Sequence, residues 1–145
     1  MDDLSEAARI RRGVVRLNRR LRQERGGEGR LTPNQLIVLG HLYRHRSATP
    51  GEVAAAERQR PQSLTRVFAE LEAEGLIERE PSAVDRRQSV LTLSAEGRRA
   101  LELDMAERDV WLEAALTSLS ETERGLLMLA AAVMERLADS EGPEV

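Results

Sequence analysis

The sequence predicts a mainly helical fold that contains one short β-hairpin. Helix-forming residues such as Ala, Leu, Glu and Arg dominate its 145 positions, and long amphipathic stretches recur along it. The Ser/Thr-x-x-Glu/Gln pattern with which many helices begin occurs at Thr32, Thr49 and Ser120. Hydrophobic residues make up 41% of the chain but aromatic residues only 2%, so the core has to consist of Leu, Val, Ile and Ala.

Two helices are predicted at the start of the chain. The first spans residues 4–22, where apolar residues recur at helical spacing, and the glycines at 26, 27 and 29 end it. The second begins at Thr32, has Pro33 at its first helical position, and ends near residue 46. Its spacing predicts one apolar face, formed by Leu36, Leu39 and Tyr43.

A helix-turn-helix follows. The pattern predicts a short helix over residues 50–57, a turn at 58–61, and a helix over 62–74 that ends at Gly75. The apolar residues of the last helix have the spacing of a single buried stripe: Leu64, Val67, Phe68 and Leu71.

The rest of the chain contains the hairpin and two long helices. Residues 76–80 and 89–93 are predicted strands, and the loop between them protrudes. Ser94 is placed to cap a helix that runs to about residue 116, and Ser120 caps a last helix to about residue 137. This order predicts a winged helix-turn-helix, a three-helix core with a β-hairpin wing, between N- and C-terminal helices.

The outward face of the helix over residues 62–74 has the chemistry of a DNA-reading surface. With the apolar stripe buried, its exposed residues near the N-terminus are Gln62, Ser63, Thr65 and Arg66. A helix N-terminus attracts phosphate, and Gln and Arg are able to read base edges in the major groove. The alternative for this helix alone is an ordinary solvated surface.

The loop of the hairpin supports the same interpretation. Arg86 and Arg87 lie together at its tip, where they suit a narrow, electronegative minor groove, and Asp85 is placed to orient one of them. A charged loop by itself is usually only solvated. A helix-turn-helix followed directly by a basic hairpin, however, forms a coherent surface for docking on DNA.

The net charge of −3 is unevenly distributed. Residues 1–30 carry +4 and residues 58–99 carry +1, whereas residues 100–145 carry −8. The acidity therefore lies in the C-terminal helices, and the local charge of the docking face decides whether DNA binds.

Several other classes of function are disfavoured. The chain contains no cysteine, which excludes disulfides, thiol chemistry and Cys-based zinc sites. His41 and His45 have the i, i+4 spacing of metal ligands, but no Glu follows His41, so both are expected at the surface or in an interface. We expect no metal, no cofactor and no enzymatic activity. No signal peptide or membrane span is predicted, and the expected location is cytoplasmic.

The order of these segments resembles the MarR family of regulators over nearly the whole chain. The matching segments lie on the predicted reading helix, the strand after it, the loop tip, and the entry to the long helix: Ser63-Leu64-Thr65-Arg66-Val67, Leu71-Glu72-Ala73-Glu74-Gly75-Leu76-Ile77-Glu78-Arg79, Asp85-Arg86-Arg87, and Leu91-Thr92-Leu93-Ser94-Ala95-Glu96-Gly97.

The resemblance implies roles for individual residues. Arg66 would contact DNA or anchor the wing aspartate Asp85, Arg87 would enter the minor groove, and Arg86 would touch the backbone. Gln62, Ser63 and Thr65 would face the major groove. Arg60 occupies a position where some members of the family have an acid, which favours an additional phosphate contact.

The predicted assembly is a homodimer. Apolar residues in residues 1–30 and 94–145 exceed what a small winged helix needs as cover, so these segments are expected to form a helical dimerisation region around the DNA-binding region at 31–93. Such a dimer would bind double-stranded DNA at a pseudo-palindromic operator, most simply as a repressor. The alternative is a winged-helix module that binds another protein and no DNA.

The resemblance also implies a small effector. In the family a lipophilic or aromatic ligand lodges between the DNA-binding region and the dimer helices. The side chains expected to line such a pocket, chosen by location alone, are Leu17, Leu21, Tyr43 and Trp111.

Overall fold

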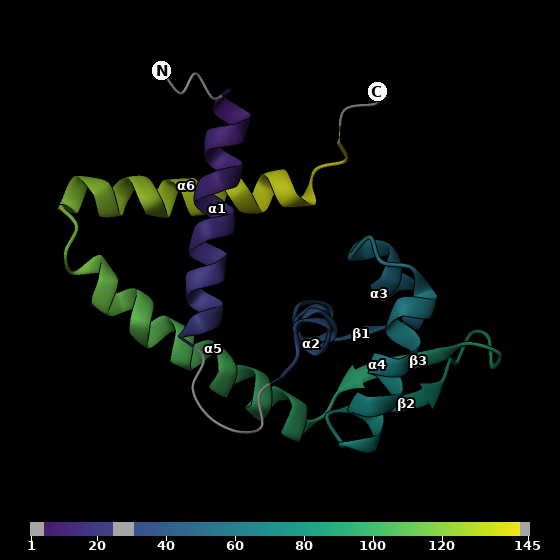
Figure 1. The fold of residues 1–145 in the computed structure, drawn as a ribbon. Helices are drawn as coiled ribbons and strands as arrows, with labels where there is room; N and C mark the ends of the chain where they lie inside the picture. The colour runs from purple at the N-terminus through teal and green to yellow at the C-terminus, as the bar shows by residue number, and fades with distance from the viewer. Residues whose placement is uncertain (1–4, 25–30, 143–145) are drawn as a thin grey trace. The chain divides into compact units, whose positions relative to one another are not determined.

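The computed structural model describes residues 5–24 and 31–142, so the glycines at 26, 27 and 29 lie outside the described residues. The elements follow the predicted order, with one additional short strand after the second helix (Figure 1). They are α1 (Glu6–Gln23), α2 (Pro33–His45), β1 (Ser47–Ala48), α3 (Pro50–Ala56), α4 (Pro61–Ala73), β2 (Ile77–Pro81), β3 (Ser89–Leu93), α5 (Ala95–Leu116) and α6 (Glu121–Asp139). The mainly helical winged helix-turn-helix fold is confirmed.

The chain divides into two compact units, one up to Arg108 and one from Asp109, which are described separately. The boundary between the two units falls inside α5 and does not coincide with the boundaries expected for the functional regions. The functional regions expected at 31–93 and at 1–30 with 94–145 stay a prediction.

The helix starts follow from local hydrogen bonds. The Thr32 hydroxyl accepts from the Gln35 N–H at 3.2 Å and the Gln35 side chain accepts from the Thr32 N–H at 2.9 Å, which completes the predicted capping box. Ser120 and Glu123 form the same reciprocal pair. At Thr49 only the hydroxyl bond to the Glu52 N–H is present, so the full box predicted there is wrong and a simple N-cap takes its place.

The wing belongs to a three-stranded antiparallel sheet with the order β1-β3-β2. The hairpin register pairs Ile77 with Leu93 at its base and Pro81 with Ser89 near its tip. The added strand β1 pairs Ala48 with Leu91. Two residues are too few for an alternating pattern, which is why the sequence does not reveal β1.

The core lies where α2, α3 and α4 meet the sheet. Its fully buried side chains are aliphatic, as the composition predicts, and Phe68 joins them. The face predicted for α2 needs a correction, because Tyr43 is 41% exposed whereas Val38, Leu39 and Leu42 are buried. The helix presents the 38/39/42 face to the core, which leaves Tyr43 outside, with the Arg98 guanidinium 5.0 Å from its ring centre.

The two terminal helices α1 and α6 bury no residue in the single chain. Both carry large exposed apolar side chains, and these are Ile10, Val14, Val15 and Leu17 on α1 and Leu126, Leu127, Met128, Leu129, Met134 and Leu137 on α6. Leu101 of α5, by contrast, is buried in the core. Within residues 5–24 and 31–142, no helix combines the length and the hydropathy that a membrane crossing requires.

Candidate DNA-binding surface

The helix-turn-helix consists of α3, a turn over residues 57–60, and α4. The turn closes with two hydrogen bonds, from the Arg58 N–H to the Ala55 carbonyl at 3.2 Å and from the Gln59 N–H to the Ala54 carbonyl at 2.8 Å. This is the pattern of a Schellman motif, in which the residue after the helix cap is usually glycine. Here that residue is Arg58, with φ of 50°. An exposed arginine therefore occupies a conformation that costs about 1 kcal/mol in an L-residue.

The predicted burial of α4 is confirmed. Leu64, Val67, Phe68 and Leu71 are buried, and the residues predicted to face outward, Gln62, Ser63, Thr65 and Arg66, are exposed. Their role in contacting DNA stays a prediction.

The N-terminus of α4 has no side-chain cap. Arg60 occupies the N-cap position without a capping hydrogen bond, Pro61 follows at the first helical position, and the first turn contains no acid. Among the helices that the structure describes, each of the others begins at a residue whose hydroxyl accepts from the first turn: Ser5, Thr32, Thr49, Ser94 and Ser120. The positive end of α4 is thus left open for an external acceptor, and phosphate is the acceptor that such ends favour.

Two side chains on this face have partners within α4. The Thr65 hydroxyl donates to the Pro61 carbonyl at 3.0 Å, so it is left as an acceptor toward solvent. Arg66 Nε lies 2.9 Å from Glu70 Oε1, but its side chain is 89% exposed. Because an exposed ion pair contributes only about 0–1 kcal/mol, Arg66 is able to exchange Glu70 for a DNA group at little cost.

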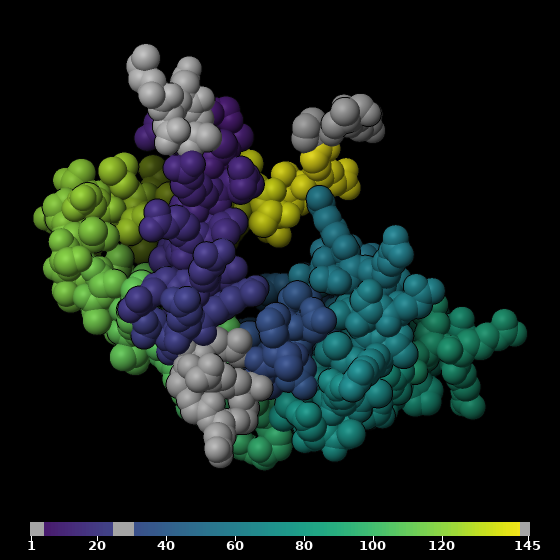
Figure 2. Space-filling model, in the orientation of Figure 1, coloured from purple at the N-terminus to yellow at the C-terminus, as the bar shows by residue number. Residues whose placement is uncertain are grey.

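The loop between β2 and β3 projects from the body of its unit (Figures 1 and 2). The Ser82 N–H donates to the Gln88 carbonyl at 2.8 Å, and the Ser82 hydroxyl accepts from the N–H groups of Val84 and Asp85. One carboxylate oxygen of Asp85 accepts from the Arg87 N–H at 3.0 Å. The loop is therefore ordered by hydrogen bonds among its own residues.

The wing arginines are exposed at the tip of this loop. Asp85 holds the backbone of Arg87, whereas Arg66 is paired with Glu70 in this structure. The predicted roles of Asp85, Arg86 and Arg87 in binding DNA stay predictions. The role of Ser82 in ordering the loop was not predicted from the sequence, although a serine directly after Pro81 in a loop is a recognisable turn signal.

Arg58 is a second residue that the sequence reading missed. It is exposed in the turn before α4, two positions from Arg60. A left-handed residue after a helix is usually predicted from a glycine, and because α3 is followed by Arg58 instead, the sequence does not reveal this conformation.

His41 is buried, which corrects the expected position at the surface or in an interface. It lies on the core side of α2, with Nδ1 3.5 Å from Oε1 of Glu57 in the turn after α3, and Arg44 also reaches that oxygen at 3.1 Å. Burial, followed by the electrostatic interaction with the neighbouring His45, lowers the pKa of His41 and favours its neutral form. His45 itself is exposed, with its ring centre 4.5 Å from that of His41.

The effector pocket expected at Leu17, Leu21, Tyr43 and Trp111 stays a prediction. Leu17 and Tyr43 are exposed, Leu21 is half-buried, and Trp111 belongs to the second unit. The first unit has a hollow of about 220 Å³ lined by three apolar residues, three arginines, one asparagine and one glutamate: Asn18, Arg22, Pro33, Leu36, Ile37, Arg44, Glu57 and Arg108.

Comparison with known proteins gives consistent matches. A family model described as MarR family matches residues 31–88. An HTH-type transcriptional regulator of Mycobacterium tuberculosis is 35% identical over 137 residues, which is 94% of this chain and 95% of the relative. The HTH-type transcriptional repressor MdtR of Bacillus subtilis is 33% identical over 110 residues, 76% of this chain and 69% of the repressor.

A solved structure is also similar to this chain. The crystal structure of a protein from Pseudomonas aeruginosa PA01 is similar with a TM-score of 0.77 and 41% identity, covering 97% of each chain.

Proposed function

Because this chain belongs to the MarR family and is a DNA-binding transcriptional regulator rather than an enzyme, we propose that it represses transcription as a homodimer on a pseudo-palindromic operator. The observation that carries the proposal is the open N-terminus of α4, uncapped and free of acids, beside an exposed row of Gln62, Ser63 and Arg66. In this proposal α4 lies in the major groove and the wing arginines enter the minor groove.

The dimer is supported by the apolar faces of α1 and α6. Side chains such as Ile10 and Leu126 are more than half exposed in the single chain, and exposed apolar faces of this kind are typical of protein interfaces. An isologous interface would bury them on both copies at once. The two α4 helices would then read half-sites about one helical turn apart.

Repression is supported by MdtR, which is named a repressor. A dimer seated on a promoter would block polymerase by occupying the DNA. The location in the cytoplasm stays a prediction.

We further propose that a small molecule releases the dimer from its operator. The hollow beside α2 combines the apolar side chains of Leu36 and Ile37 with Asn18, Glu57 and three arginines. Of these arginines, Arg44 is paired with Glu57 and Arg108 with Asp104, and the third is Arg22. This mixture suits a small aromatic or lipophilic acid, whose ring contacts the aliphatic side chains and whose carboxylate pairs with a guanidinium.

The test is a gel-shift titration with the DNA flanking the chain's own gene, at about 50 mM and about 200 mM salt. Specific binding that weakens by tenfold or more is expected, because counterions are released as arginines meet phosphates. Competition with unrelated DNA separates specific from general binding. Absent or salt-independent binding contradicts the proposal and favours a winged-helix module that binds protein.

A further inference from the structure

The C-terminal end of α4 is closed by a glycine turn. The Gly75 N–H donates to the Glu72 carbonyl at 3.1 Å and the Leu76 N–H donates to the Leu71 carbonyl at 2.9 Å. These bonds form a Schellman motif, with Gly75 at φ of 73°. They satisfy the donors of Gly75 and Leu76 and leave the carbonyl groups of both residues for other partners.

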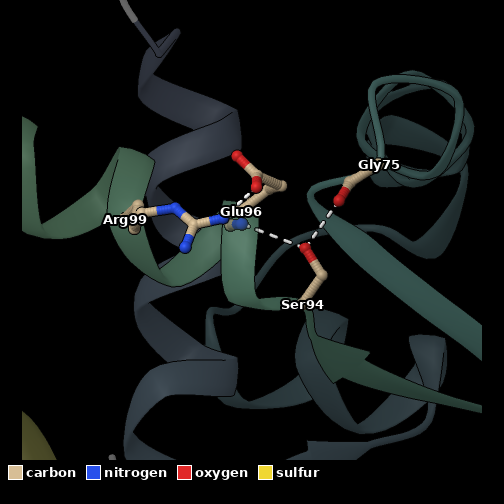
Figure 3. A network of polar contacts seen from close by, with 5 residues as sticks. Gly75, Ser94, Glu96 and Arg99 are labelled. Carbon is tan, nitrogen blue, oxygen red and sulfur yellow. Dashed lines mark hydrogen bonds and ion pairs between the residues drawn. The ribbon is translucent and has the colours of Figure 1, made fainter.

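Ser94 is the partner of both carbonyl groups. Its N–H donates to the Leu76 carbonyl at 3.1 Å, and its hydroxyl donates to the Gly75 carbonyl at 2.5 Å. The same hydroxyl oxygen accepts from the Gly97 N–H at 3.0 Å and so caps α5 (Figure 3). One buried serine therefore ties the end of α4 to the first turn of α5.

Gly97 allows the two segments to approach closely. It is buried in the first turn of α5, and a Cβ added there would overlap the Leu76 carbonyl oxygen and lie 2.9 Å from Leu93 Cδ1. The helix thus packs directly on the peptide that leaves α4. The Glu96–Arg99 ion pair in the same turn is exposed on both sides and contributes little to this contact.

The wing begins at the same place. The first residue pair of the hairpin is Ile77 with Leu93, one residue beyond Leu76 on one strand and one before Ser94 on the other. We call the contact among Gly75, Leu76, Ser94 and Gly97 the α4–α5 joint. The orientation of α4, the base of the wing and the start of α5 are all fixed at it.

The geometry points to Ser94 as a positioning residue for DNA recognition. It sets the angle between α4 and α5, and in the proposed dimer this angle sets the separation of the two α4 helices. The inference rests on the proposed function, because it requires a dimer that reads two half-sites. Ser94 itself lies at the end of α4 opposite the uncapped reading end.

Position 94 requires a side chain that donates a hydrogen bond to the Gly75 carbonyl and accepts one from the Gly97 N–H. Alanine removes both bonds of the hydroxyl. Aspartate retains the cap on the Gly97 N–H but has no proton for the Gly75 carbonyl, so Ser94→Asp separates the joint from the cap. Threonine retains both functions. Ser120→Ala is the matched control, because its hydroxyl caps α6 in the same way by accepting from the Glu123 N–H.

The experiment uses the full chain and an operator obtained by selection from random DNA. Affinity is measured for that operator and for versions whose half-sites are one or two base pairs closer or farther apart. The wild type is expected to prefer one spacing strongly. Ser94→Ala and Ser94→Asp should reduce that preference by about tenfold, because a loosened joint allows the helices to adapt, whereas Ser94→Thr and Ser120→Ala should retain it.

The outcomes separate this inference from the proposed function. If the wild type binds no operator, the proposed function fails and the inference falls with it. If the wild type shows a spacing preference that Ser94→Asp retains in full, the regulator stands and the positioning role is wrong. Thermal unfolding of each variant checks folding. A loss of stability with an unchanged preference assigns Ser94 to the cap of α5 alone and also overturns the inference.

Discussion

The two ends of α4 are finished in opposite ways. At its N-terminus, Arg60 offers no capping side chain and the first turn contains no acid. At its C-terminus, a Schellman motif and Ser94 supply partners for the groups around Gly75. Helix caps typically contribute about 1 kcal/mol, so the open end costs stability that the closed end does not.

This difference fits the role proposed for α4 as the helix that reads DNA. The closed end fixes the direction of α4 relative to the wing and α5, while in the proposed complex the uncapped end offers its positive dipole to a DNA phosphate. Substitutions at the closed end should therefore change stability first, and substitutions at the open end should change DNA affinity first.

The largest effect is expected for Gly97→Ala at the closed end. The added methyl group would overlap the Leu76 carbonyl oxygen, so α5 has to move away from the end of α4. We expect a loss of about 3 kcal/mol in the free energy of unfolding, measured by urea denaturation. Gly125→Ala, where nothing lies within 4 Å of the new Cβ, is the control and should gain up to about 1 kcal/mol. Equal behaviour of the two variants would contradict the close packing at the joint.

Arg60→Asp at the open end should separate stability from function. The aspartate would cap α4 and raise the free energy of unfolding by about 1 kcal/mol. It would also place a negative charge where phosphate is expected and weaken operator binding by about tenfold or more. Arg60→Ser caps without the added charge and should show a smaller loss of affinity. An Arg60→Asp variant with undiminished affinity would show that this end does not meet DNA.

Arg87→Ala tests the wing against the helix. The Arg87 side chain is exposed, and Arg87 joins the hydrogen bonds of the loop through its backbone N–H, so folding and the dimer should be unaffected. Operator affinity should fall by about tenfold, measured by gel shift alongside the molecular mass in solution. Substitution of the exposed Glu80→Ala in the preceding strand provides a control on the wing itself. Unchanged affinity in Arg87→Ala would remove the wing arginine from the proposed interface.

The smallest effects are expected where α3 and α4 end. Both helices close with the same hydrogen bonds, but the left-handed residue is Arg58 after α3 and Gly75 after α4. Arg58→Gly should gain and Gly75→Ala should lose about 1 kcal/mol of stability, measured by thermal unfolding. Arg58→Gly should also lower DNA affinity if the arginine contacts phosphate. Changes of the same sign in both variants would refute the strain assigned to Arg58.

Much of the fold could be predicted because its signals are local. Capping residues such as Thr32 and Ser120 act within four residues, and the stripe from Leu64 to Leu71 reports burial directly. The face of α2 was misjudged at Tyr43, because the choice between two adjacent apolar faces depends on which one the sheet and the other helices cover.

The candidate site was predictable in its residue types but not in its contacts. The exposure of Gln62 and Arg66 follows from helical periodicity. The ion pair between Arg66 and Glu70 could not be predicted, because the sequence allows Arg66 several other partners. The joint at Ser94 depends on residues 19 positions apart, which no local pattern connects. The arginine-lined hollow was missed for the same reason, because its walls come from separated helices.

The self-contained wing loop has a consequence for how such a regulator can change over generations. Residues 82–88 hold their shape with bonds to one another, through Ser82 and Asp85. Ala83 and Arg86 are exposed within this frame. In the proposed complex, mutations at these two positions would alter which DNA the tip prefers while the fold of the chain is left intact. Such mutations would change the DNA preference of the proposed regulator at little cost in folding stability.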